Sequence, residues 1–148
     1  MSLSIDPSMQ VSVASCNAQL DAGFATWLLA LGLRVESISG NGEVVMRMPY
    51  SEAITRQPGI VCGQALMSLI DTCMVMVCWA GMGRIGNCTT VNQNTNFTRA
   101  AVASVDLIAT GTIRKNGRQL VFGDVVVHEE GHPTPVATAA LIYMVLER

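Results

Sequence analysis

The most constraining feature of this 148-residue chain is one long apolar segment, residues 60–80, with a carboxylate at its centre. The segment is long enough to cross a membrane, but Asp71 lies in its middle together with Gln64, Ser68 and Thr72. A central Asp is costly in lipid. The remaining sequence has strand patterns that a single-span membrane protein would not need. We therefore expect a helix that is surrounded by protein rather than by lipid.

Hydrophobic spacing and turn signals predict two helices and six strands. Helices are expected over residues 17–31 and 62–79. Strands are expected over residues 33–39, 43–48, 88–97, 103–114, 119–129 and 136–146. A helix that is apolar on all sides must be covered on all sides. The sequence thus predicts an α+β fold in which six antiparallel strands curl around one long central helix.

The composition fits a single domain over residues 1–148, with residues 1–15 loosely ordered. Half of the residues are hydrophobic and 14% are charged, which provides ample material for a core. This high apolar content also predicts that a second copy of the chain covers part of the surface.

Charge and residue usage argue against several classes of protein. Nine Lys and Arg against eleven Asp and Glu give a net charge of −2, and few residues are aromatic, so no nucleic-acid partner is expected. Five Cys without a CxxC pair favour reduced thiols in a cytoplasmic protein. His128 and His132 lack a complete ligand set, so no metal is expected. The N-terminus lacks the pattern of a signal peptide.

Asp71 is the strongest candidate for chemistry. At about 100° per residue, Gln64, Ser68 and Asp71 fall on one stripe of the long helix. Two interpretations stay open: a structural carboxylate satisfied by neighbouring amides and hydroxyls, or a base or nucleophile held in a cleft. Gly63, at the start of the helix, offers an unpaired N–H at the positive end of the helix dipole. It is either an oxyanion donor or simply a loop-to-helix junction.

These residues carry a resemblance to a known family. Residues 57–72, QPGIVCGQALMSLIDT, are similar to the signature of hotdog-fold acyl-CoA thioesterases of the phenylacetate-degradation type. That signature usually reads N-x-x-G-x-x-H-G-G, with an Asp eight residues after the first Gly of the pair. Gly59, Gly63 and Asp71 occupy the matching positions. Further weak matches are residues 90–101 with the family's third strand, Gly117-Arg118 with a hairpin and Val136-Ala137 with the final strand.

The resemblance implies a hotdog fold, a homodimer or homotetramer, and an active site at the dimer interface. The Gly63 amide would polarise the thioester carbonyl of an acyl- or aryl-CoA. Asp71 of the partner subunit would activate water or attack directly. No cofactor is implied beyond the coenzyme A that is part of the substrate.

Further residues are expected to contact the substrate. Thr90 is either a hydroxyl that positions water or an ordinary strand residue. Basic side chains are needed for the phosphates of coenzyme A, although the group around residues 114–118 also fits a solvated hairpin tip. The full expected set is Gln57, Cys62, Gln64, Ser68, Thr90, Arg99, Lys115 and Arg118.

Three departures from the signature keep a rival function open. Cys62 stands where the family often has His, Gln64 replaces the second Gly, and Arg56 stands at the frequent Asn/Gln position. These departures favour a non-catalytic acyl-CoA-binding protein as the alternative. A hotdog hydratase or dehydratase is a second rival, but such enzymes usually use a His paired with a carboxylate, and no His lies near this helix in the sequence.

Overall fold

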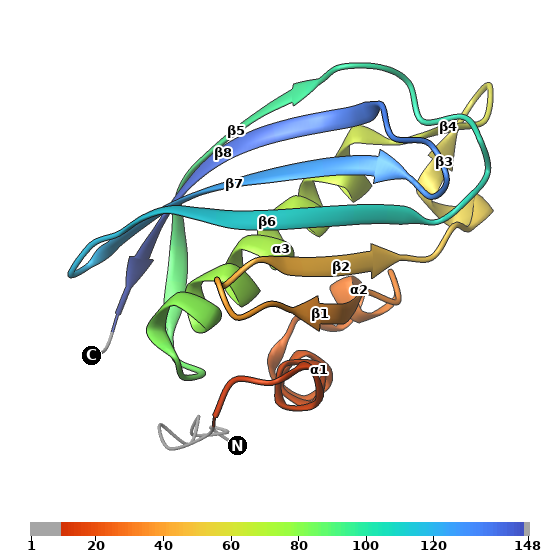
Figure 1. Ribbon diagram of the computed structural model, residues 1–148. Helices are drawn as coiled ribbons and strands as arrows, with labels where there is room; N and C mark the ends of the chain where they lie inside the picture. Colours follow the sequence, from red (N-terminus) through yellow and green to blue (C-terminus); the bar gives the residue numbers. More distant parts are fainter. Residues whose placement is uncertain (1–9, 147–148) are drawn as a thin grey trace.

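A six-stranded antiparallel sheet curls around one long helix (Figure 1). The computed structural model describes residues 10–146. The central helix is α3 (Gly63–Met82). The strand order is β1 (Arg34–Ile38), β2 (Val44–Met48), β6 (Leu107–Asn116), β7 (Leu120–Glu129), β8 (Pro135–Val145) and β5 (Cys88–Phe97). The predicted architecture is confirmed.

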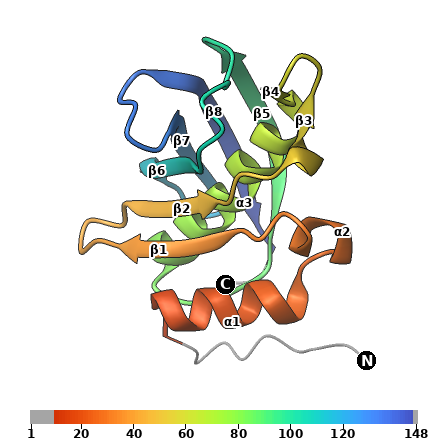
Figure 2. The same ribbon diagram turned by 90° about the vertical axis from the view of Figure 1, so that its right-hand side faces the viewer.

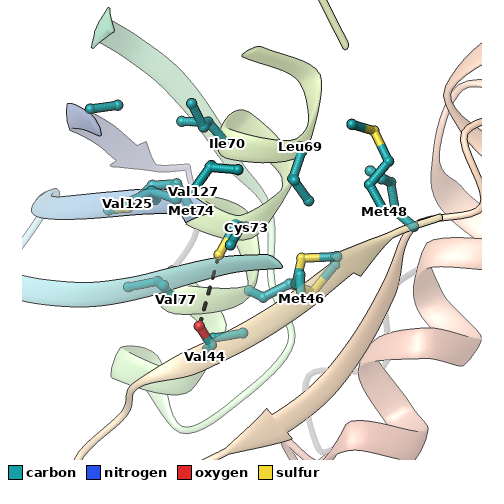
Figure 3. Packing of buried hydrophobic residues seen from close by; sticks show 14 of the residues in the cluster. Val44, Met46, Met48, Leu69, Ile70, Cys73, Met74, Val77, Val125 and Val127 are labelled. Atoms are coloured by element: carbon teal, nitrogen blue, oxygen red, sulfur yellow. Dashed lines mark hydrogen bonds between the residues drawn. The ribbon is translucent and has the colours of Figure 1, made fainter. Parts of the chain in front are cut away.

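The core lies between α3 and the concave face of the sheet. Figure 3 shows Leu69, Cys73 and Val77 of α3 beside Val44 and Met46 of β2, all fully buried. Each such side chain contributes about 1.5–3 kcal/mol when it leaves water. By length and composition α3 would also suit a membrane span, but most of it is buried inside the protein, as in the core helix of a globular fold.

Two glycines of the sheet lie against side chains of α3. A Cβ on Gly111 of β6 would stand 2.5 Å from Val77 Cγ2, and one on Gly123 of β7 would stand 2.7 Å from Met74 Cε. Both distances are shorter than real Cβ contacts, so a side chain at either position would force a neighbouring side chain to move. At Gly111 the neighbours are the short side chains of Val77 and Cys73, so this glycine is what lets α3 lie close to β6.

The N-terminal region differs from its prediction. The single helix expected over residues 17–31 is two helices, α1 (Val13–Gly23) and α2 (Thr26–Leu29). Ser12 and Ser15 form a capping box, in which the Ser12 hydroxyl accepts from the Ser15 N–H at 3.0 Å and the Ser15 hydroxyl accepts from the Ser12 N–H at 2.9 Å. Loose ordering is thus wrong for residues 13–15. For residues 1–9 the prediction lies outside the described residues.

Two loops also differ from their predictions. The predicted helices and strands leave out residues 49–61. This segment contains a 3-10 turn (Glu52–Ile54) and a small antiparallel pair, β3 (Thr55–Arg56) with β4 (Ile60–Val61). Strand β6 begins at Leu107 rather than at Ala103, because the Ala103 N–H donates to the Glu129 side chain at 2.6 Å instead of joining the sheet.

The two edge strands of the sheet differ in whether another element covers them. Helix α1 lies along edge strand β1 (Figure 2), where Asn17 accepts from the Val35 N–H at 2.9 Å and donates to the Val35 carbonyl at 3.0 Å. Strand β5 forms the other edge, and within residues 10–146 no strand pairs with its outer side. An uncovered edge of ten residues is able to pair with another chain.

Candidate functional site

The carboxylate of Asp71 is held from one side by two hydroxyls. Thr90 of β5 donates to Asp71 Oδ1 at 2.8 Å, and Tyr143 of β8 donates to the same oxygen at 2.6 Å. The Tyr143 hydroxyl also lies 2.9 Å from the backbone carbonyl oxygen of Asp71. Thr90 and Tyr143 are directly opposite each other on the neighbouring strands β5 and β8, so both donors come from one cross-strand pair near the middle of α3.

The second carboxylate oxygen has no such restraint. Within residues 10–146 no protein donor bonds to Asp71 Oδ2. Asp71 is half-buried and borders a shallow pocket of about 370 Å³ with Met67, Ser68, Thr90 and Gln93. Both interpretations of Asp71 thus describe part of the geometry, because one oxygen is satisfied by hydroxyls while the carboxylate also borders a pocket.

The groups around Asp71 influence one another's protonation. Burial, followed by the nearby charge of Asp71, raises the pKa of Tyr143 far above its ordinary value, so the phenol stays protonated and acts as a donor. A hydrogen bond to Cys88 of β5, followed by burial, raises the pKa of Cys78 of α3. Cys88 also feels the negative charge of Asp71. Cys88 is therefore the thiol that is electrostatically linked to this carboxylate.

Gly63 forms a second potential site at the start of α3. The preceding residue, Cys62, makes no side-chain capping bond, so no side chain of the N-cap occupies the first N–H groups of the helix. A Cβ on Gly63 would lie 3.2 Å from Phe97 Cζ, so the missing side chain admits the Phe97 ring of the same chain. Gly63 borders a pocket of about 380 Å³ together with Leu66, Phe97 and Arg99.

The structure does not bring Gly63 and Asp71 together within one chain. They are eight residues apart on α3, which is about 12 Å along the helix axis. They also line different pockets. Neither pocket alone contains both a carboxylate and the uncapped helix start.

Some of the residues expected to contact substrate lie near the Asp71 pocket, and others lie near Gly63. Ser68 and Thr90 lie at the Asp71 pocket, and the Ser68 hydroxyl donates to the Gln64 carbonyl at 2.8 Å. Cys62 and Gln64 flank Gly63, with Cys62 half-buried and Gln64 exposed. Gln57 is exposed in the turn between β3 and β4.

The three expected phosphate ligands are in different environments. Arg99 donates to Glu129 at 2.7 Å and to the Thr134 carbonyl at 3.1 Å, so its guanidinium is already engaged. Lys115 and Arg118 are exposed on the β6–β7 hairpin (Figure 1). Asn116 of that hairpin donates to the Gly81 carbonyl at 2.8 Å, which places it at the end of α3 opposite to Gly63.

Sequence reasoning missed two residues of this region, Tyr143 and Glu129. The only local signal for Tyr143 is a hydroxyl on a strand of apolar residues. Glu129 is 2% exposed and accepts from Arg99 and from the Ala103 N–H at 2.6 Å. Burial alone would raise the pKa of Glu129. The hydrogen bonds and the charge of Arg99 outweigh burial, so the pKa of Glu129 is lowered.

No group of three or more metal-ligating side chains is found in residues 10–146. His128 Nδ1 lies 3.1 Å from the Glu129 carbonyl oxygen, and His132 is exposed in the turn that follows β7. The described part of the chain therefore offers no assembled metal site to add to Asp71.

Comparison with solved structures finds proteins of similar fold. Solved structures of similar fold include a thioesterase family protein from Silicibacter pomeroyi, with 20% identity, 93% of this chain and 100% of that chain covered, and a TM-score of 0.79. The PaaI protein from the phenylacetic acid degradation operon of E. coli has 21% identity, coverage of 92% and 97%, and a TM-score of 0.75. Zebrafish thioesterase superfamily member 2 has 24% identity, coverage of 91% and 95%, and a TM-score of 0.74.

These neighbours establish the fold, which is the hotdog fold expected from the sequence. A comparison with curated proteins finds no match. The family model of the thioesterase superfamily matches residues 58–136, which include α3, β5, β6 and β7. The chain therefore belongs to the thioesterase superfamily.

Proposed function

We propose that this protein hydrolyses the thioester of an acyl- or aryl-CoA to a free acid and coenzyme A. The observation that carries the proposal is the environment of Asp71. Two hydroxyls fix Oδ1, while Oδ2 has no protein donor and the residue borders a pocket. A carboxylate held in this way is suited to act as a general base or as a nucleophile.

The chemistry requires two groups, a carboxylate and an oxyanion donor. As a base, Asp71 takes a proton from water while the water oxygen attacks the carbonyl carbon. The carbon–sulfur bond then breaks, and the proton returns to the leaving sulfur. As a nucleophile, Asp71 attacks the carbonyl carbon, the carbon–sulfur bond breaks and coenzyme A leaves as a thiolate. Water then hydrolyses the mixed anhydride, which releases the free acid, restores the Asp71 carboxylate and supplies the proton for the thiolate. In either route the Gly63 N–H, at the positive end of α3, stabilises the negative carbonyl oxygen.

The two groups meet only if a second copy of the chain contributes one of them. Gly63 of one protomer and Asp71 of the partner subunit would form a complete site in a homodimer, or in a homotetramer built from such dimers. Strand β5 has an open edge, whereas α1 covers the opposite edge of the sheet. Three large apolar side chains on β5 and α3 are exposed in one chain: Val91 at 52%, Phe97 at 51% and Met67 at 41%. This surface is suited to dimerisation.

The positions of the basic residues suggest how coenzyme A lies. Lys115 and Arg118 have no ion-pair partner in residues 10–146, which leaves both charges available for phosphate. Their hairpin contacts Gly81, ten residues beyond Asp71 and about 15 Å along α3. The protomer that supplies Asp71 would therefore also supply these two side chains. Gln57, Cys62, Gln64 and Arg99 would line the other end of the substrate.

Coenzyme A enters as part of the substrate, and we infer no separate cofactor. We place the protein in the cytoplasm, without a membrane or nucleic-acid partner. All five cysteines are free thiols, which suits a reducing compartment.

The deciding experiment is a thiol-release screen with short, medium, long and aryl acyl-CoAs, on wild type and on Asp71→Asn. Loss of the carboxylate should lower kcat about 10²- to 10⁴-fold while the KM changes little. A folded Asp71→Asn that hydrolyses its best acyl-CoA as fast as wild type would refute the role of Asp71. A wild type that binds acyl-CoA without releasing thiol would instead be the non-catalytic binding protein that Arg56, Cys62 and Gln64 suggest.

A further inference from the structure

Tyr143 is the polar residue among the helix-facing positions of β8. Its neighbours on that face are Ala139, Leu141 and Val145, and all four residues are buried. A phenylalanine would supply the same ring to this apolar surface. The hydroxyl therefore needs its own explanation, because a buried hydroxyl without a partner is costly. Only 1% of Tyr143 is exposed, so its partner has to come from the protein.

Asp71 is that partner. The Tyr143 hydroxyl lies 2.6 Å from Asp71 Oδ1 and 2.9 Å from the Asp71 backbone carbonyl oxygen. A phenol has one proton, and the shorter contact, to the carboxylate, is the charge-assisted hydrogen bond. Thr90 donates to the same Oδ1 at 2.8 Å but is an exposed residue, so water competes for that bond. Tyr143 is thus the donor that water does not replace.

We propose that Tyr143 is a positioning residue, whose hydroxyl anchors Asp71 Oδ1 and so directs Oδ2 into the pocket. The inference rests on the proposed function, in which Asp71 reacts through its free oxygen. Without the hydroxyl, Asp71 keeps Thr90 as its one side-chain donor in residues 10–146 and rotates more freely.

One thiol is linked to this group, because the charge of Asp71 acts on Cys88 of β5 as well as on Tyr143.

The first test is Tyr143→Phe, which removes the hydroxyl and keeps the ring. We expect kcat to fall about 10- to 100-fold with KM within about twofold of wild type, because the carboxylate is misplaced rather than lost. Tyr50→Phe is the matched control, since it removes the chain's other phenol at a site away from Asp71. A folded Tyr143→Phe with unchanged kcat would overturn the proposal.

The second test does not depend on the folding of that variant or on turnover. In Tyr50→Phe, Tyr143 is the sole tyrosine, so growth on 3-fluorotyrosine places one fluorine label beside Asp71. Its ¹⁹F resonance should move in Asp71→Asn, because the carboxylate that accepts from the phenol is replaced by an amide. A resonance that is the same with and without Asp71→Asn overturns the inference. If the coupling is present but no thioester is cleaved, the proposed function has failed and the Tyr143–Asp71 link stands.

Discussion

Gly63 and Asp71 lie on the same helix but border different pockets. Gly63 begins α3 and Asp71 follows eight residues later, about 12 Å along the axis. Groups that act on one thioester must lie within hydrogen-bond reach of adjacent atoms, about 3 Å. One chain therefore holds two half-sites, and the proposed mechanism requires that two chains combine them.

The backbone N–H of Gly63 can be removed without disrupting the helix. Proline is tolerated at the first helical position, and Cys62 before it has φ −70° and ψ 149°, the extended conformation that a residue before proline prefers. We expect Gly63→Pro to lower kcat about 10²- to 10³-fold, the typical cost of losing one oxyanion donor. Thiol-release kinetics with the best acyl-CoA measures the effect.

Gly63→Ala is the matched control, since both variants add a Cβ that meets Phe97 at 3.2 Å, while only proline removes the N–H. Phe97 is half-exposed and has room to move. Equal losses in Gly63→Ala and Gly63→Pro would mean that crowding, rather than the missing donor, causes the defect.

Mixing two inactive variants should restore activity. In a heterodimer of Asp71→Asn with Gly63→Pro, one of the two shared sites contains an intact Gly63 and an intact Asp71, and the other contains both changes. Random reassortment of equal amounts should therefore return about a quarter of wild-type activity. The measurement is thiol release after the subunits are dissociated and reassembled together. If the mixture stays as inactive as its parents although the heterodimer forms, the two groups do not work across an interface.

The two unneutralised cations of the β6–β7 hairpin should affect substrate binding more than turnover. We expect Lys115→Ala and Arg118→Ala each to raise the KM for acyl-CoA about 3- to 10-fold with kcat nearly unchanged, and the effect should shrink at high salt. Arg114→Ala is the control on the same hairpin, because its guanidinium already pairs with Asp124. A KM that rises equally in Arg114→Ala would point to general charge on the hairpin instead of a phosphate site.

The fold could be predicted because its signals are local. The alternation of strands, the Asn-Gly turns and the apolar helix each depend on neighbouring residues, and α3 was placed within three residues of its observed ends. The predicted C-terminal end, residue 79, is three residues short of the observed end at Met82. The left-handed residue that ends the helix is Gly83, with φ 68°.

The candidate site could be predicted only in part, since its contacts join distant positions. Asp71 stood out as a charge on an apolar helix, but Tyr143 is 72 residues away and reaches it only through the pairing of β5 with β8. Arg99 was expected to be available for phosphate. Its partner Glu129, on another strand and 30 residues away, cannot be identified from local spacing. Burial and pairing of this kind come from the tertiary structure.

Glu129 should stabilise the loop that borders the Gly63 pocket. It is nearly fully buried, and it bonds to Arg99 and to the Ala103 N–H. Glu129→Gln keeps the shape and the acceptor for Ala103 but loses the charge that pairs with Arg99. We expect the free energy of unfolding to fall by about 1–3 kcal/mol, because Arg99 is one-third exposed and recovers some solvation. Chemical denaturation measures this, and Arg114→Gln, which breaks an exposed ion pair, should cost under about 1 kcal/mol.

The ion pair between Glu129 and Arg99 should make part of the folding stability depend on pH. The lowered pKa of Glu129 decides whether acid strengthens or weakens the fold. Its pKa is lowered in the folded protein, so the folded state holds the ionised form more strongly than the unfolded state does, where a Glu titrates near about 4.3. The stabilisation is fully present above that unfolded value and is lost as the pH falls through the lower folded value. The Tm difference between wild type and Glu129→Gln should therefore be largest near neutral pH and shrink below about pH 4. A difference that stays constant from pH 7 to pH 3 would show that the Glu129 charge adds nothing and that the amide merely packs less well.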